Sequence, residues 1–161
     1  MRRKRQSGPI EQIEIGLFVL NLTADERSTL LGFVDQLNEV IASPADDPRV
    51  RRLFPTAYHD NPEHDAEYQG FMREELAQSR RASIDTVRSV LVSDEPMTEA
   101  QLYSFMTVLN SLRLVLGTLL DVDEGEDLDL IPEDSPAFGQ AQLYEYLGWL
   151  LEWTVSALSG E

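Results

Sequence analysis

The sequence contains no cysteine, which excludes disulfide bonds, thiolate zinc sites, iron–sulfur clusters and cysteine redox switches within this chain. It also has no apolar run close to the roughly 20 residues that a membrane helix needs, because Arg113 interrupts the segment 112–120. The basic N-terminus is not followed by the apolar segment of a signal peptide. We therefore expect no contact with membrane and a cytoplasmic protein.

Positive charge is scarce in the second half of the chain. The net charge is −16, and Arg113 is the single basic residue after position 88. The only dense basic cluster is residues 2–5. Binding to nucleic acid usually needs a clustered basic face, so the charge argues against nucleic acid except through this cluster. We expect residues 1–9 to form a flexible basic arm and residues 10–161 to form a single helical domain.

The beginning of this domain carries a β pattern and then a helix start. Aliphatic residues alternate at positions 13, 15, 17 and 19, which predicts a strand or a hairpin around Gly16. Thr23 and Glu26 have the spacing of a capping box. They predict a helix over residues 24–42, with leucine, valine and isoleucine on one face.

Three further helices follow from their start signals. Asn61-Pro62 predicts a helix that runs to residue 92. Thr98 and Gln101 form a second capping box, and the apolar segment 99–120 that follows is expected to be the central core helix. Ser135-Pro136 precedes the last helix. The sequence thus predicts a mainly all-α fold, a compact bundle of about four main helices with a short N-terminal strand or hairpin.

Patterns for catalysis are missing. The chain has no Gly-rich phosphate loop and no serine nucleophile elbow, and its two histidines, His59 and His64, lie on either side of a helix start, where their rings need not converge. The acidic segment 121–135 departs from a calcium loop at Glu126 and Pro132. We expect no catalytic residue, no cofactor and no metal, and keep a carboxylate- or metal-dependent enzyme of unknown reaction as an alternative.

Arg113 lies on the apolar stripe of the predicted core helix. Breaking a buried ion pair costs about 3–5 kcal/mol, so a guanidinium that faces a core must have partners. We expect a structural ion pair with an acid of the preceding long helix, for which Glu74, Glu75 and Asp85 are candidates. The alternative is an arginine that binds an anion or a partner.

The last helix carries more large aromatic residues than one core stripe needs. Tyr and Trp are enriched at protein interfaces. We therefore expect Tyr146, Trp149 and Trp153 to form a surface for a protein partner. An equal alternative is that the same residues form the interface of a homodimer through this helix.

Three segments resemble the motifs of an actinobacterial family, formerly a domain of unknown function, that is named after the oxidative-stress regulator AosR and is often encoded beside the protease adaptor ClpS. The first includes Arg-Leu-Phe-Pro at 52–55, the second spans 110–118 and the third spans 146–150. The residues that carry the resemblance are Arg52, Phe54, Pro55, Tyr58, Asn110, Arg113, Gly117, Gly148 and Trp149.

The resemblance implies a non-enzymatic regulatory protein that acts in the transcriptional stress response through protein–protein contact, with a sigma factor as one candidate partner. The switch proposed for the family uses cysteine oxidation. Since this chain has no cysteine, that switch cannot operate here. A direct DNA-binding regulator is the alternative within the same class.

Overall fold

The computed structural model describes residues 8–43, 49, 53, 60–119, 133–134 and 138–160. The expected basic arm therefore lies outside the described residues, except for Gly8 and Pro9. Within the described residues, the chain forms two strands, two helices, a short third strand and two more helices. These are β1 (Ile10–Glu14), β2 (Leu17–Leu20), α1 (Ala24–Ile41), α2 (Pro62–Val92), β3 (Met97–Thr98), α3 (Glu99–Leu119) and α4 (Phe138–Ser159).

The predicted fold class is confirmed, because the protein is mainly helical with a small antiparallel sheet at its start. Gly16 supplies the turn between β1 and β2 with a φ of 77°, a left-handed conformation that costs glycine little. The sheet order is β1-β2-β3. β3 pairs Met97 with Phe18 of β2, and both side chains are buried.

α1, α2 and α3 begin where the capping signals place them, whereas the signal Ser135-Pro136 of the last helix lies outside the described residues. The backbone N–H of Glu26 donates to the Thr23 hydroxyl at 3.1 Å, and that of His64 donates to the Asn61 side chain at 3.2 Å. The amide oxygen of Gln101 accepts from the backbone of Thr98 at 2.9 Å. Each contact satisfies a donor that the first helical turn would otherwise leave without a partner.

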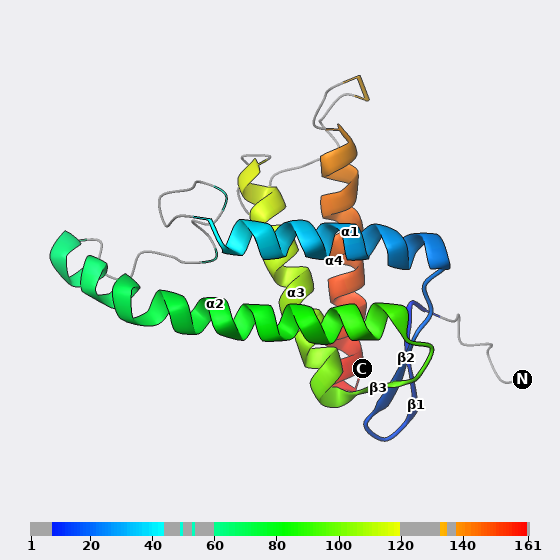
Figure 1. Cartoon of the computed structure of the whole chain (residues 1–161). Helices are drawn as coiled ribbons and strands as arrows, with labels where there is room; N and C mark the ends of the chain where they lie inside the picture. Colours follow the sequence, from blue (N-terminus) through cyan, green and yellow to red (C-terminus); the bar gives the residue numbers. More distant parts are fainter. Residues whose placement is uncertain are drawn as a thin grey trace, which may run out of the picture.

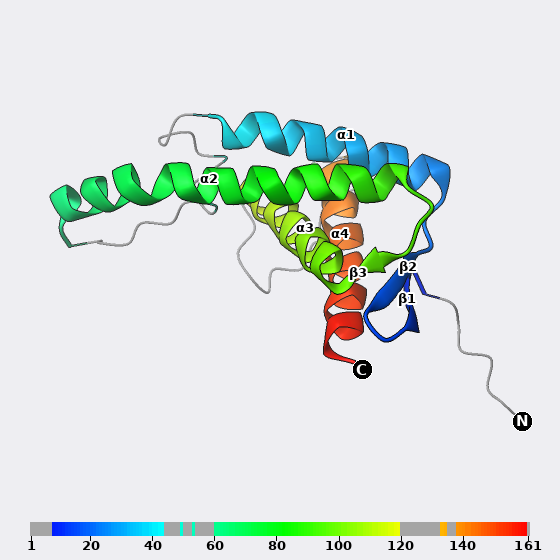
Figure 2. The same cartoon turned by 60° about the horizontal axis from the view of Figure 1, so that its bottom comes forward.

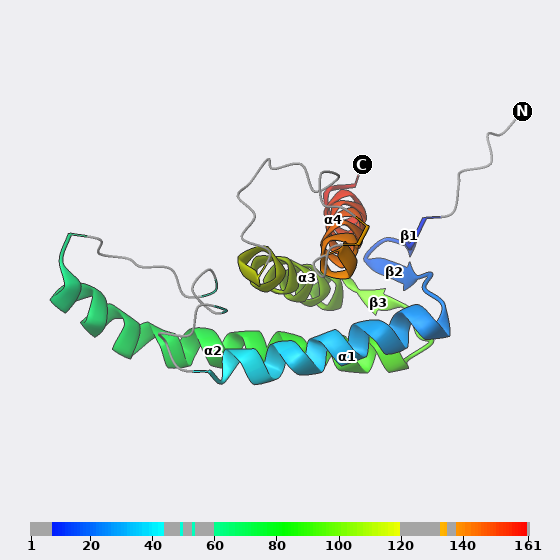
Figure 3. The same ribbon diagram turned by 90° about the horizontal axis from the view of Figure 1, so that it is seen from above.

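The four helices lie in two layers. α1 and α2 run antiparallel side by side, and α3 and α4 form a second antiparallel pair that crosses beneath them (Figures 1 and 2). Seen from above, the layer of α1 and α2 is separate from the layer of α3 and α4, and the small sheet lies beside α4 (Figure 3). None of the helices in the described part of the chain is long and apolar enough to cross a membrane.

The core lies between the two layers, and α3 is its centre, as its apolar sequence predicts. α3 packs against α1, α2 and α4. Side chains that are almost fully buried come from every helix and from the sheet: Phe18, Leu30, Val34, Leu37, Ile84, Val87, Met97, Leu102, Phe105, Leu109, Leu147 and Leu150.

Candidate functional site

Three aromatic side chains lie on one face of α4. Tyr146, Trp149 and Trp153 follow each other at spacings of three and four residues, which places them on the same side of a helix. Trp149 is 46% exposed and Trp153 is 36% exposed, whereas Tyr146 is half-buried. The ring centroids of Tyr146 and Trp149 are 5.9 Å apart with an interplanar angle of 37°. The structure thus brings together the three residues predicted to form a partner surface.

A groove of about 610 Å³ lies beside these aromatic rings. We call it the aromatic groove. Two elements of the chain complete it: the residues that lead into β1, and the segment from the end of β2 to the first turn of α1. Its lining residues are Gly8, Pro9, Asn21, Leu22, Glu26, Trp149 and Trp153.

The first two described residues, Gly8 and Pro9, are fixed in place at this groove. The side chain of Asn21 donates to the carbonyl of Gly8 at 3.0 Å, and its backbone N–H donates to the carbonyl of Pro9 at 2.7 Å. The indole of Trp153 lies directly against Gly8, because a Cβ at that position would be 2.5 Å from the ring. Position 8 therefore has no room for a side chain.

Glu26 provides the groove with a carboxylate that is held from two sides. The hydroxyl of Tyr146 donates to Oε2 of Glu26 at 2.9 Å, and the hydroxyl of Thr23 donates to Oε1 at 3.1 Å. The hydrogen bond from Tyr146 is the main reason why the pKa of Glu26 lies below its ordinary value. Burial, together with the contact to Glu26, raises the pKa of Tyr146. At neutral pH the carboxyl is therefore ionised and the phenol is protonated.

Arg113 does not form the ion pair that the sequence predicted, so that prediction is wrong. Its Nη2 donates to the hydroxyl of Tyr144 at 3.4 Å, and its Cζ lies 4.9 Å from the centre of that ring. Asp85 instead contacts Arg88. The reason is that Arg113 faces α4 rather than α2, where its side chain is half-buried and its Nε has no hydrogen-bond partner among the described residues.

Two of the sequence motifs meet at this arginine. A Cβ at Gly148 would be 3.4 Å from Nε of Arg113, so the glycine leaves the space that the guanidinium occupies. Gly117 is buried and Asn110 is exposed. The remaining motif residues, Arg52, Phe54, Pro55 and Tyr58, lie outside the described residues.

Arg27, which no sequence pattern predicted, joins three segments of the chain. Its guanidinium donates to five backbone carbonyls, with distances from 2.7 to 3.3 Å. Three of these carbonyls are at the end of α2, where a cation also interacts favourably with the helix dipole. No sequence signal marks such a contact, because all the acceptors are backbone atoms. The acceptors are the carbonyls of Leu20, Leu22, Val90, Leu91 and Ser93.

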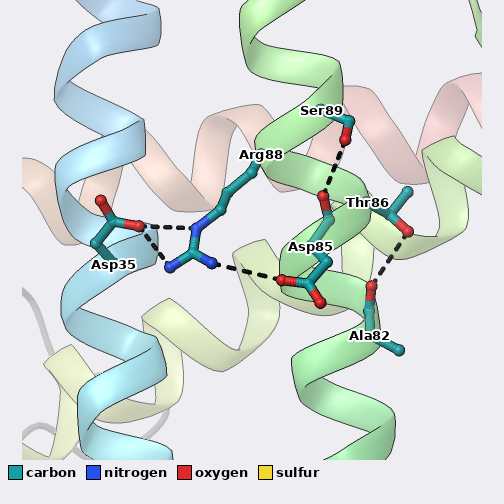
Figure 4. Close-up of polar contacts among 6 residues, drawn as sticks. All are labelled: Asp35, Ala82, Asp85, Thr86, Arg88 and Ser89. Atoms are coloured by element: carbon teal, nitrogen blue, oxygen red, sulfur yellow. Dashed lines mark hydrogen bonds and ion pairs between the residues drawn. The ribbon is translucent and has the colours of Figure 1, made fainter.

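Two more arginines connect α2 to its neighbours. Arg88 contacts Asp35 of α1 at 2.6 Å and Asp85 of its own helix at 3.4 Å (Figure 4). Arg80 donates to the hydroxyl of Ser111 in α3 at 2.9 Å and to the carbonyl of Leu53 at 3.0 Å, and burial lowers its pKa. These contacts are structural, and they lie away from the aromatic groove.

A second hollow of about 690 Å³ lies between α1, α3 and α4. Its walls are mostly aliphatic and include Leu37, Leu112 and Leu143, with Glu39 and Arg49 among its polar residues. In the described ranges of the chain, no three His, Asp or Glu side chains gather in a way that could hold a metal ion. The two hollows therefore differ, since only the aromatic groove combines exposed indoles with a carboxylate.

The fold and the groove define a mainly helical protein with an exposed aromatic face on α4. Residues 2–158 match the model of a family described as Domain of unknown function (DUF2017). The match covers almost the whole chain, so the protein belongs to this family. No curated protein matches the chain, and no solved structure matches it.

Proposed function

We propose that this protein is a non-enzymatic cytoplasmic regulator that binds a protein partner through the aromatic groove. The observation that carries the proposal is the exposure of Trp149 and Trp153, the only two tryptophans of the chain, beside that groove. Tryptophan and tyrosine are the residues most often found at the energetic centres of protein interfaces. An exposed pair of indoles on a rigid helix therefore favours a binding surface.

The motif resemblance to the AosR family extends this proposal to the transcriptional stress response, with a sigma factor as one candidate partner. The contact of Arg113 with the position of Gly148 supports treating the second and third motifs as one structural unit. Because the chain has no cysteine, regulation would depend on the amount or the accessibility of the partner rather than on a thiol.

The test is capture of the partner from cells of the native host with purified protein as bait. The variant is Trp149→Ala, and the matched control is Tyr103→Ala, which removes an equally exposed aromatic side chain from α3 (48% exposed). We expect the wild type and the control to retain the same partner, identified by mass spectrometry, and the Trp149 variant to lose it. Equal capture by all three proteins would contradict the proposal.

A direct DNA-binding regulator is the weaker alternative, because a net charge of −16 repels phosphate. A mobility-shift assay at physiological salt separates the two functions. Sequence-dependent binding at sub-micromolar concentration would favour DNA binding, and its loss after replacing residues 2–5 by serine would assign it to the basic cluster.

A further inference from the structure

We propose that the aromatic groove binds a cationic side chain, an arginine or a lysine on an exposed segment of the partner, with Glu26 as its counter-ion and Trp149 and Trp153 as its aromatic walls. The inference rests on the proposed function, because it specifies the chemistry of the protein that the groove receives.

The groups that donate hydrogen bonds to the carboxylate of Glu26 are all neutral. They are the hydroxyl of Tyr146 and the hydroxyl and backbone N–H of Thr23. Among the residues that the structure describes, no lysine or arginine forms an ion pair with this carboxylate. An ionised carboxylate has about four acceptor positions, and these three contacts leave room for one more donor. Within the described part of the chain, the groove thus presents a fixed negative charge without a counter-ion.

Two indole rings, those of Trp149 and Trp153, line the groove. A cation is attracted to the face of an aromatic ring, and tryptophan gives the strongest such attraction among the side chains. Arg113, 4.9 Å from the centre of the Tyr144 ring, shows the same kind of contact elsewhere on α4. Trp149 and Trp153 are exposed, so their rings are accessible to a side chain from outside.

The face of α4 around the groove carries negative charge. Glu145 and Glu152 are exposed, and their spacing to Trp149, four before and three after, places them on the same face of α4. α4 carries no lysine or arginine. A surface with this charge attracts a basic partner over a distance and repels an acidic one. A second copy of this chain, with a net charge of −16, is disfavoured for the same reason.

The groove is also organised before anything binds. Asn21 fixes Gly8 and Pro9, Gly8 supports the indole of Trp153, and Tyr146 holds Glu26. A site whose groups are already in position loses less conformational entropy on binding. This favours recognition of a single long side chain even where the surrounding contact is small.

The experiment uses the full chain and its intrinsic fluorescence, because both tryptophans of the protein line the groove. The probe is a short Gly-Ser peptide with one central arginine, and its control is the same peptide with citrulline, which has nearly the same shape but no charge. We expect a saturable fluorescence change with the arginine peptide and binding at least about tenfold weaker with the citrulline peptide.

The variant is Glu26→Gln, which keeps the capping box because glutamine serves at the same position. Its matched control is Asp25→Asn, which removes the same charge from the neighbouring, exposed position of the same helical turn. We expect affinity for the arginine peptide to fall about tenfold in the Glu26 variant and to change less than about twofold in the control. Circular dichroism melting verifies that both variants are folded.

Three results would overturn the inference. The first is equal binding of the arginine and citrulline peptides, and the second is equal binding by the wild type and Glu26→Gln. The third is binding that occurs only after residues 2–5 are replaced by serine, which would assign the groove to the basic segment of this chain itself. Partner capture separates this inference from the proposed function: loss with Trp149→Ala but not with Glu26→Gln would refute only the cation site.

Discussion

The two helix layers use arginine in different ways. In the layer of α1 and α2, Arg27 donates to five carbonyls of other segments and Arg88 connects the two helices through Asp35. In the layer of α3 and α4, the single arginine, Arg113, makes one long hydrogen bond and one ring contact. The comparison indicates that directional polar contacts position the first layer, whereas aliphatic packing holds the second.

The largest effect is expected from a cavity in the second layer. Leu147 of α4 has no exposed surface, and replacing a buried leucine by alanine costs about 2–5 kcal/mol. We expect Leu147→Ala to lower the free energy of unfolding by about 3 kcal/mol, measured by urea denaturation. The control is Leu151→Ala at a half-buried position of the same helix. Similar losses of stability in both variants would show that the side chain of Leu147 stabilises the protein no more than that of Leu151.

A smaller loss is expected when the polar contacts of the first layer are removed. Arg27→Met leaves five carbonyls without their charged donor, and a hydrogen bond to a charged group contributes about 1.5–3 kcal/mol. We expect a loss of about 2 kcal/mol, because Arg27 is only half-buried. Arg88→Met is the control, since exposed ion pairs contribute about 0.2–1 kcal/mol. Equal losses would contradict the distinction between the two arginines.

Arg113→Met should lower the free energy of unfolding less than it would if Arg113 formed the buried ion pair predicted from the sequence. No carboxylate of the described residues loses a partner, and methionine keeps much of the apolar contact. We expect a loss of about 1 kcal/mol or less, compared with about 3–5 kcal/mol for a broken buried pair. A shift of the urea midpoint as large as that of Leu147→Ala would mean that charge, not packing, stabilises the second layer.

The smallest effect is expected from the hydrogen bond between Tyr146 of α4 and Glu26 of α1, which connects the two layers. Tyr146→Phe removes the hydrogen bond to Glu26, which contributes about 0.5 kcal/mol at this partly exposed site. The pKa of Glu26 is lowered from 4.5 in the folded state, so this stability is present above that pH and is lost as the pH falls through the folded pKa. We expect the difference between wild type and variant, measured by urea unfolding, to shrink between neutral pH and about pH 3. A difference independent of pH would exclude the carboxylate as its source.

The helix starts could be predicted from the sequence because their causes are local. Thr23, Asn61 and Thr98 each bond to a residue three positions further along, and Gly16 lies at the turn of its own hairpin. β3 was missed, because two residues are too few to show a period. Its formation depends on pairing with β2, which is far away in the sequence.

The candidate site could be predicted only in part. The spacing of the aromatic residues places them on one face of α4, but the contact of Tyr146 with Glu26 spans 120 residues, and no local pattern encodes it. The partners of Arg113 were predicted wrongly for a related reason. A position on the apolar stripe of a helix shows that the side chain faces a neighbouring helix. It does not show which of the neighbouring helices that is.

Gly8 and Trp153 constrain each other from opposite ends of the chain. A substitution at position 8 places carbon atoms where the indole lies, so it should be accepted only together with a smaller residue at position 153. The two positions are therefore expected to vary as a pair among related sequences. A side chain at position 8 and a large ring at position 153 should not occur together. Such covariation would indicate that the same groove is present in related proteins whose structures are not known.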